Sequence, residues 1–103
     1  MASIFYEAGY YYPDFIQILM ICCYILKSEK TDSYYVGCTE NINARLALHN
    51  AGRVRATKSG VPWNLFYKES FANLAGAFRR EQQIKKWKSR KAIERLVKSS
   101  KIL

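Results

Sequence analysis

The apolar run MICCYIL, residues 20–26, is the segment around which a fold of this chain has to be built. It is continuously apolar and contains β-branched and aromatic side chains, a composition that is typical of a buried strand. The polar segment KSEKTD follows it as a turn, and SYYVG at residues 33–37 has the character of a returning strand. The sequence therefore predicts a β-hairpin built on a buried strand.

The rest of the chain is predicted to form helices around one further strand. In chain order we expect a helix over 40–50 with Thr39 as its N-cap, a loop over 52–62, a strand over 63–71, a helix over 73–87 with Asn73 as a cap, and a last helix from Ser89 whose apolar side holds Ile93, Leu96 and Val97. This order, ββαβαα, predicts a small α+β domain with helices packed on a short sheet.

A chain of 103 residues has room for one hydrophobic core. We expect the domain to span residues 20–98, with residues 99–103 as a C-terminal tail. Residues 1–19 lack the basic start and the small-residue cleavage site of a signal peptide, so we expect an arm outside the domain, as an over-extended start codon would produce. The apolar run over 15–26 is too short to cross a bilayer, so no membrane association is expected.

The positive charge of the chain is concentrated in its second half. The formal net charge is +9, yet residues 1–50 carry three Lys or Arg against five Asp or Glu, and residues 51–103 carry fourteen against three. A basic face is typical of a protein that binds a polyanion, most often nucleic acid, because cationic side chains displace the counterions of the phosphates. A solvated lysine face that serves solubility is the alternative.

The three cysteines form neither a disulfide framework nor a zinc motif. Cys22 and Cys23 are neighbours, Cys38 is left over, and the single histidine, His49, completes no zinc spacing with them. We interpret the cysteines as buried small apolar residues of a protein in a reducing cytoplasm. A thiol–histidine nucleophile is the alternative.

Polar side chains occupy the apolar faces of two predicted helices. Arg45 and His49 are one turn apart and fall in the arc that Ile42, Leu46 and Leu48 define on the first helix. Burying an unpaired charge costs several kcal/mol, so such side chains need partners. The second long helix shows the same anomaly: a glutamate falls in the middle of its apolar arc, which consists of Leu74, Ala77, Phe78 and Ile84.

Two interpretations account for these positions. In the first, Arg45 and Glu81 form a buried salt bridge, or the helices rotate so that both are exposed. In the second, an arginine, a histidine, a carboxylate and nearby tyrosines converge on one site suited to phosphodiester chemistry. A carboxylate can hold one divalent cation that also binds phosphate oxygens, and arginine can stabilise the pentavalent transition state. A tyrosine, with an ordinary pKa of about 10, can act as a base where cations lower that value.

Two tripeptides, with their spacing to these polar residues, resemble the signature of the GIY-YIG endonuclease superfamily. CCY at residues 22–24 and YVG at residues 35–37 take the places of its two signature tripeptides. The segments YYVGCTENINARLALHNAG and FRREQQIKKW are similar to its small stand-alone, single-domain branch of URI-domain and UPF0213-like proteins. The likeness covers about residues 20–98. It implies a three-stranded antiparallel sheet flanked by helices, and cleavage of DNA with one divalent ion, Mg²⁺ or Mn²⁺.

The resemblance assigns roles to five residues. Tyr24 and Tyr35 match the tyrosines of the two tripeptides, which makes Tyr35 the candidate general base and Tyr24 its support. Arg45 matches the arginine that contacts the scissile phosphate, and His49 matches the position one turn later that orients the water or the base. Glu81 matches the metal-binding glutamate.

The chain departs from the family pattern at three places. Cys22 replaces the usual glycine of the first tripeptide, and Cys38 stands where some relatives carry a lysine. No asparagine follows Asn73, although better-studied relatives have one after the metal glutamate. The role of that asparagine is therefore absent or filled by another group.

The implied function is that of a metal-dependent endonuclease or nickase that hydrolyses DNA in repair or processing, on branched or damaged duplexes and with low sequence specificity. No obligate protein partner is inferred. Sequence-blind phosphate contacts are expected from Arg53, Arg55, Lys58, Lys85, Lys86, Lys88, Arg90 and Lys91.

Two other functions remain open. The first is a non-catalytic nucleic-acid-binding module that keeps the fold. The second is a protein-interaction adaptor that uses Trp63, Phe66 and Tyr67, and it has less support because these residues alternate as a half-buried strand does.

Overall fold

The sheet is three-stranded and antiparallel, and the apolar run of the sequence forms its central strand. The computed structural model describes residues 20–101, so the expected arm over 1–19 lies outside the described residues. The elements are, in order, β1 (Ile21–Ser28), β2 (Tyr34–Thr39), α2 (Ile42–Asn50), the 3-10 helix η1 (Arg55–Gly60), β3 (Trp63–Phe71), α3 (Leu74–Trp87) and α4 (Arg90–Lys101). The strand order is β2–β1–β3, and the predicted α+β architecture is confirmed.

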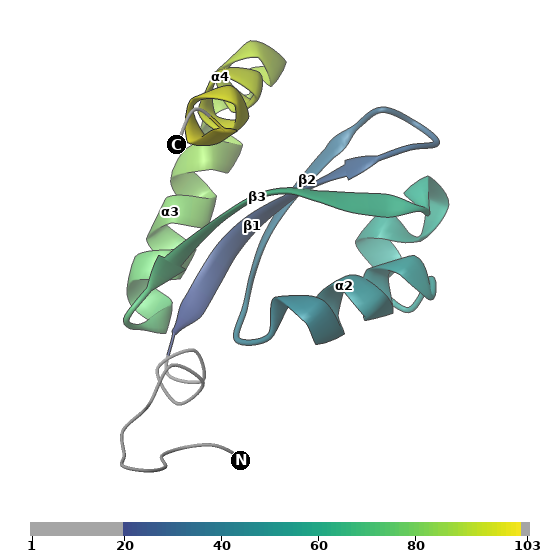
Figure 1. Cartoon of the computed structure of the whole chain (residues 1–103), viewed down its shortest axis with the longest axis horizontal. Coiled ribbons are helices and arrows are strands. Elements are labelled where there is room, and N and C mark those ends of the chain that lie inside the picture. Colours follow the sequence, from purple (N-terminus) through teal and green to yellow (C-terminus); the bar gives the residue numbers. More distant parts are fainter. Residues whose placement is uncertain (1–19, 102–103) are drawn as a thin grey trace, which may run out of the picture.

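Strand β1 is buried because both faces of the sheet are covered. Figure 1 shows α2 on one face and α3 with α4 on the other. The cluster on the α3 side consists of the buried residues Cys23, Ile25, Val36, Ile84 and Val97. The cluster on the α2 side consists of Cys22, Tyr24, Leu26 and Trp63. Because successive side chains of a strand point to opposite faces, a strand covered on both sides has to be apolar without interruption.

Helix α2 begins two residues later than expected. Asn41 is its N-cap, with Oδ1 accepting a hydrogen bond from the backbone N–H of Ala44 at 3.1 Å, so the prediction of Thr39 was wrong. Thr39 is the last residue of β2, because strand pairing continues to that position. The expected cap of α3 is confirmed: Oδ1 of Asn73 accepts from the backbone N–H of Gly76 at 2.9 Å.

The buried face of α3 differs from the expected one. Ala77 and Ile84 are buried, whereas more than half of Leu74 and of Phe78 is exposed. The helix is rotated so that Glu81 lies at the margin of the buried face and not at its centre. The prediction for Leu74 and Phe78 was wrong because a narrow three-stranded sheet covers only a narrow stripe of this helix.

The segment expected as a loop over 52–62 is partly ordered as η1, in which Thr57 and Gly60 are buried. A Cβ on Gly60 would lie 2.5 Å from Cζ2 of Trp63, so the turn packs directly on the indole ring. Thr57 accepts at its backbone oxygen a hydrogen bond from the indole N–H of Trp63 at 2.8 Å. These contacts hold η1 against the start of β3.

The last helix covers the α3 side of the sheet. Val97 is buried, and Ile93 and Leu96 pack against the same cluster, as the sequence predicted. The helix continues to Lys101, three residues beyond the expected end of the domain at 98. Within residues 20–101, no helix is both long enough and apolar enough to cross a membrane.

The left-handed conformation of Lys88, at the end of α3, leads to a prediction about stability. Lys88 follows the helix in the left-handed conformation, with a φ of 47°. This conformation costs a non-glycine residue about 1 kcal/mol, so Lys88→Gly is expected to raise the free energy of unfolding in urea by a similar amount. The matched control Lys86→Gly removes the same charge from inside the helix and is expected to lower it by about 1 kcal/mol. Equal destabilisation by both variants would contradict this account.

Candidate functional site

Tyr24 and His49 meet in the interior between β1 and α2. The Tyr24 hydroxyl oxygen lies 2.9 Å from Nε2 of His49, and the two side chains are 1% and 0% exposed. A buried polar group without a partner costs about 1–3 kcal/mol, and this contact satisfies both groups. The histidine on the apolar arc of α2 is therefore a buried partner of the first tyrosine.

The second ring nitrogen of His49 is held by Thr57. Nδ1 of His49 lies 2.7 Å from the Thr57 hydroxyl, which also donates to the backbone oxygen of Val54 at 3.4 Å. Because the Thr57 hydroxyl donates to Val54, its oxygen accepts a hydrogen bond from Nδ1–H of His49. Nε2 of His49 then carries no proton and accepts a hydrogen bond from the Tyr24 hydroxyl. Sequence reasoning missed Thr57, because only the turn of η1 directs it inward.

Tyr35 lies beside this pair on the same face of the sheet. Its ring centroid is 6.4 Å from that of Tyr24 and 5.1 Å from that of His49. Gly37 is paired with Tyr24 across the strands, and a Cβ there would lie 2.7 Å from the Tyr24 hydroxyl and 3.1 Å from Cε2 of Tyr35. The glycine of YVG is thus required for the two tyrosines to approach each other.

Arg45 places a positive charge next to the buried pair. Burial raises the pKa of Tyr24 to about 12, although a hydrogen bond with Arg45 opposes the shift. Burial also lowers the pKa of His49, and the charge of Arg45 lowers it further. Near pH 7 Tyr24 is therefore a phenol and His49 is neutral, which agrees with a hydrogen bond from the hydroxyl to Nε2.

Glu81 reaches the same region from the other side of the edge strand β2. Tyr35 and Cys38 lie on opposite faces of this strand, and Glu81 is close enough to raise the pKa of the Cys38 thiol, in addition to the larger effect of burial. The Glu81 side chain is 13% exposed, and its Oε2 lies 2.5 Å from Nζ of Lys85. Within residues 20–101 no ion pair joins Arg45 to Glu81, so the buried salt bridge, one of the alternatives considered for these two residues, is not formed.

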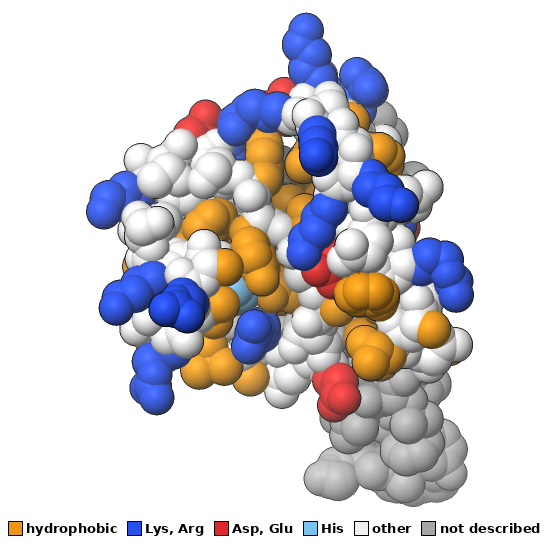
Figure 2. Space-filling model, turned by 180° about the vertical axis from the view of Figure 1, so that it is seen from behind, with side chains coloured by type: hydrophobic (Ala, Val, Ile, Leu, Met, Phe, Trp, Pro, Cys, Tyr) orange, Lys and Arg blue, Asp and Glu red, His pale blue; other side chains and the backbone are white. Residues whose placement is uncertain are grey.

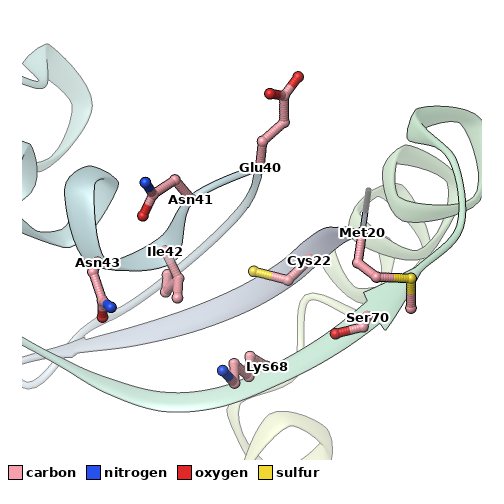
Figure 3. A pocket seen from close by; sticks show the side chains of 8 residues that line it. All are labelled: Met20, Cys22, Glu40, Asn41, Ile42, Asn43, Lys68 and Ser70. Atoms are coloured by element: carbon pink, nitrogen blue, oxygen red, sulfur yellow. The ribbon is translucent and has the colours of Figure 1, made fainter. Parts of the chain in front are cut away.

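A cavity of about 320 Å³ opens at the end of the sheet, near the start of β1. Figure 3 shows its lining residues, which are Met20, Cys22, Glu40, Asn41, Ile42, Asn43, Lys68 and Ser70. The side chain of Glu40 points away from the others in this view. None of the five family-matched residues lines the cavity, so the candidate site lies elsewhere, beside the edge strand β2.

Lys68 is a cation near Tyr24 that the sequence did not indicate, because only the pairing of β3 with β1 brings it opposite Tyr24.

The cations expected to contact phosphate fall into groups with different surroundings. One exposed group lies around η1 and consists of Arg53, Arg55 and Lys58. Another lies on the α3 and α4 side of the sheet and consists of Lys86, Lys88 and Lys91. Figure 2 shows cationic side chains on both sides of a surface with apolar side chains between them.

Arg90, one of the cations expected to contact phosphate, already has partners within the protein. Its guanidinium donates to the backbone oxygen of Asp32 at 2.6 Å, to the Asp32 carboxylate at 2.8 Å and to Glu94 at 3.1 Å. It also lies over the ring of Tyr34, 4.8 Å from the centroid. These contacts fix the start of α4 against the turn between β1 and β2, so Arg90 has a structural role, and its contact with phosphate stays a prediction.

Glu81 is the carboxylate of the candidate site that can hold a metal ion. Among the described residues, no group of three or more His, Cys, Asp or Glu could hold an ion by itself. A single carboxylate fits a hard divalent ion that keeps several waters and takes phosphate oxygens as its other ligands.

The buried histidine makes a prediction about pH, and as the only histidine of the chain it can be followed directly. Its pKa is lowered from 6.5, so the unfolded state binds this proton more tightly than the folded state. The stability from neutral His49 is therefore complete above about pH 6.5 and decreases as the pH falls through that value toward the folded pKa. We expect the imidazole proton resonance of the folded protein to titrate below 6.5. A midpoint at or above 6.5 would rule out the buried arrangement.

The Thr57 contact predicts a difference between two substitutions. Thr57→Val leaves Nδ1 of His49 without a partner and is expected to lower the free energy of unfolding by about 1–3 kcal/mol in urea denaturation. Thr57→Ser keeps the hydroxyl and should recover most of that loss. If Thr57→Val, which has the same shape without the hydroxyl, kept the stability of the parent, the hydrogen bond to Nδ1 would contribute nothing.

Comparisons with known proteins show which family the chain is similar to. The family described as "GIY-YIG catalytic domain" matches residues 20–94. UPF0213 protein SH2523 of Staphylococcus haemolyticus is 46% identical over 63 residues, which cover 60% of this chain and 76% of that protein. Structure-specific endonuclease subunit SLX1 of Phaeosphaeria nodorum is 41% identical over 49 residues, 43% of this chain and 13% of that protein.

One solved structure is similar to this chain as well. The solution NMR structure of the UPF0213 protein BH0048 from Bacillus halodurans has 29% sequence identity and a TM-score of 0.49, and the match covers 77% of this chain and 83% of that one. The family match spans both signature tripeptides, α2 and α3, and therefore every residue of the candidate site. The chain thus belongs to the GIY-YIG family.

Proposed function

We propose that this protein is a metal-dependent endonuclease or nickase that hydrolyses phosphodiester bonds of DNA, in repair or processing within the cytoplasm. The observation that carries the proposal is the meeting of Tyr24, Tyr35, Arg45 and His49 at one place, with Glu81 across the edge strand β2. The match to a catalytic-domain family supports it, and one relative is named a structure-specific endonuclease subunit.

Arg45 is the group proposed to bind the scissile phosphate. It is partly buried beside Tyr24 and His49, and no carboxylate pairs with it in the described part of the chain. Its charge is therefore available to a substrate anion. A guanidinium can donate two parallel hydrogen bonds to phosphate oxygens, and it stabilises the additional negative charge of the transition state.

Tyr35 is the proposed general base. In the hydrolytic step the water oxygen forms a bond to phosphorus, and its proton passes to the phenolate oxygen of Tyr35. The bond from phosphorus to one sugar oxygen breaks, and the electron pair stays on that oxygen, which takes up a proton from solvent. Tyr24 keeps its proton near pH 7 because burial raises its pKa to about 12, so it supports the site and does not act as the base. Its hydroxyl donates to His49, whose ring is fixed from the other side by Thr57.

Glu81 is proposed to hold one divalent ion, Mg²⁺ or Mn²⁺. Its carboxylate is slightly exposed at an open edge of the protein, where waters and phosphate oxygens can complete the ligand shell. Such an ion, when bound, supplies positive charge that polarises the phosphoryl group. Lys85 binds Oε2 of the same carboxylate, so the ammonium and the ion would share or compete for that oxygen.

The surrounding cations favour low sequence specificity. The exposed residues proposed to contact phosphates are Arg53, Arg55 and Lys58 on the α2 side of the sheet, and Lys86, Lys88 and Lys91 on the α3 and α4 side. Phosphate contacts position a nucleic acid but do not read its bases.

A non-catalytic nucleic-acid-binding module is the second candidate function. The observation that favours it is the ion pair of 2.5 Å between Glu81 and Lys85, which partly neutralises the proposed metal ligand. This candidate predicts salt-sensitive DNA binding that survives Glu81→Ala, and no cleavage with either metal.

Nicking of supercoiled plasmid in Mg²⁺, Mn²⁺ or a chelator tests the proposal. We expect the parent protein to nick DNA only with metal. Arg45→Ala is expected to slow nicking by about 100- to 1,000-fold, because it removes a charge that stabilises the transition state. Tyr35→Phe and Glu81→Ala are expected to reduce nicking to the level of the chelator control.

Matched controls are available on α4, which contributes none of the five proposed catalytic and metal-binding residues. Glu94→Ala and Arg95→Ala remove the same charges from exposed positions and are expected to keep the parent rate. Nicking that persists in Glu81→Ala would refute the metal assignment. Salt-dependent binding by every variant, without nicking by any, would establish the second candidate instead.

A further inference from the structure

Two large apolar side chains lie open to solvent on the first turns of α3. Leu74 is 61% exposed and Phe78 is 55% exposed, more than Leu48 at 42% or Leu65 at 37%. They are four residues apart on one helix and so form one surface, which we term the Leu74–Phe78 patch. Figure 2 shows apolar side chains in the open next to acidic and cationic ones on the side where α3 lies.

The patch borders the candidate site along the helix. At 100° per residue, Glu81 lies about 20° from Leu74 and about 60° from Phe78 around the axis, and Lys85 lies between those two apolar residues. Lys85 in turn pairs with Glu81 and is close enough to Tyr35 for their charges to interact. The patch therefore forms part of the rim of the proposed active site.

The size of the patch argues against a protein partner. A phenylalanine and a leucine exposed to this extent offer roughly 200 Å² of surface. A stable protein interface needs about 600 Å² on each side, so a second copy or another protein would require far more than these two residues.

Its chemistry fits a nucleobase. One aromatic ring presents a flat face to a base, and stacking of this kind is independent of sequence because every base has such a face. The neighbouring helix positions carry exposed cations, Arg79, Lys85 and Lys86, which suit the phosphates on either side of a stacked base.

We propose, on the basis of the nuclease function above, that Phe78 with Leu74 is a stacking platform for a base next to the scissile phosphate. A regular duplex keeps its bases inside the helix and would have to unstack one to reach the platform, whereas an unpaired base reaches it without that cost. The preferred substrate class is therefore DNA with unpaired bases at the cleavage point, such as a single-stranded flap or a bulge.

Oligonucleotide binding in the presence of a chelator tests the platform apart from the chemistry. Fluorescence anisotropy would compare a short single strand with a duplex of the same sequence. Phe78→Ala is expected to weaken single-strand binding by about ten-fold or more and to change duplex binding by less than about two-fold. Phe78→Trp restores the aromatic face and the affinity. The salt dependence of binding stays unchanged, because no charge is removed.

Leu48→Ala, which truncates an exposed leucine on α2, is the matched control and is expected to bind both DNAs as the parent does. Unchanged single-strand binding by Phe78→Ala, or an equal loss for single strand and duplex, would overturn the platform. Unchanged binding with an altered association state in sedimentation would assign the patch to a second copy of the chain and overturn it as well.

Cleavage separates this inference from the proposed function. With Mg²⁺ the parent is expected to cut a flap faster than a duplex, and Phe78→Ala is expected to lose that preference. A parent that binds single strands through Phe78 and cuts neither DNA would refute the nuclease function while confirming the binding platform.

Discussion

Tyr24, His49 and Thr57 form a continuous hydrogen-bonded chain in the layer between β1, α2 and η1. All three side chains are buried, so each would leave another without a partner if it were lost. These hydrogen bonds join the central strand β1, the last turn of α2 and η1, a segment that composition alone predicts to be a loop. They thereby fix the α2 layer on the sheet and at the same time present Arg45 and Tyr35 at the surface beside it.

The candidate site also depends on the position of β2 at the edge of the sheet. Tyr35 and Cys38 lie on opposite faces of this strand, so α2 contributes Arg45 to one face while α3 brings Glu81 against the other. The arginine and the glutamate consequently belong to different layers and do not pair. Among the described residues Arg45 is left without a carboxylate partner, whereas Glu81 pairs with Lys85 on its own helix.

Most of the fold could be predicted from the sequence, because the apolar run, the turn residues and the helical periodicity are local signals. The third strand was predicted with its exact bounds, Trp63–Phe71, since alternating aromatics mark a half-buried strand. The N-cap of α2 was misplaced because both Thr39 and Asn41 can cap a helix, and only strand pairing excludes the former. The apolar face of α3 was misjudged because periodicity gives the spacing of apolar residues but not how much of that face the sheet can cover.

The sequence by itself determined the order of the elements and the positions of the two tripeptides and of the five family-matched residues, because these depend on residue type and spacing along the chain. The contact of His49 with Thr57, the engagement of Arg90 by Asp32 and the exposure of Phe78 were decided by the tertiary structure. Each depends on which segments lie side by side and on how far a helix is rotated about its axis. Local propensity does not encode that rotation, since it results from the packing of the whole domain.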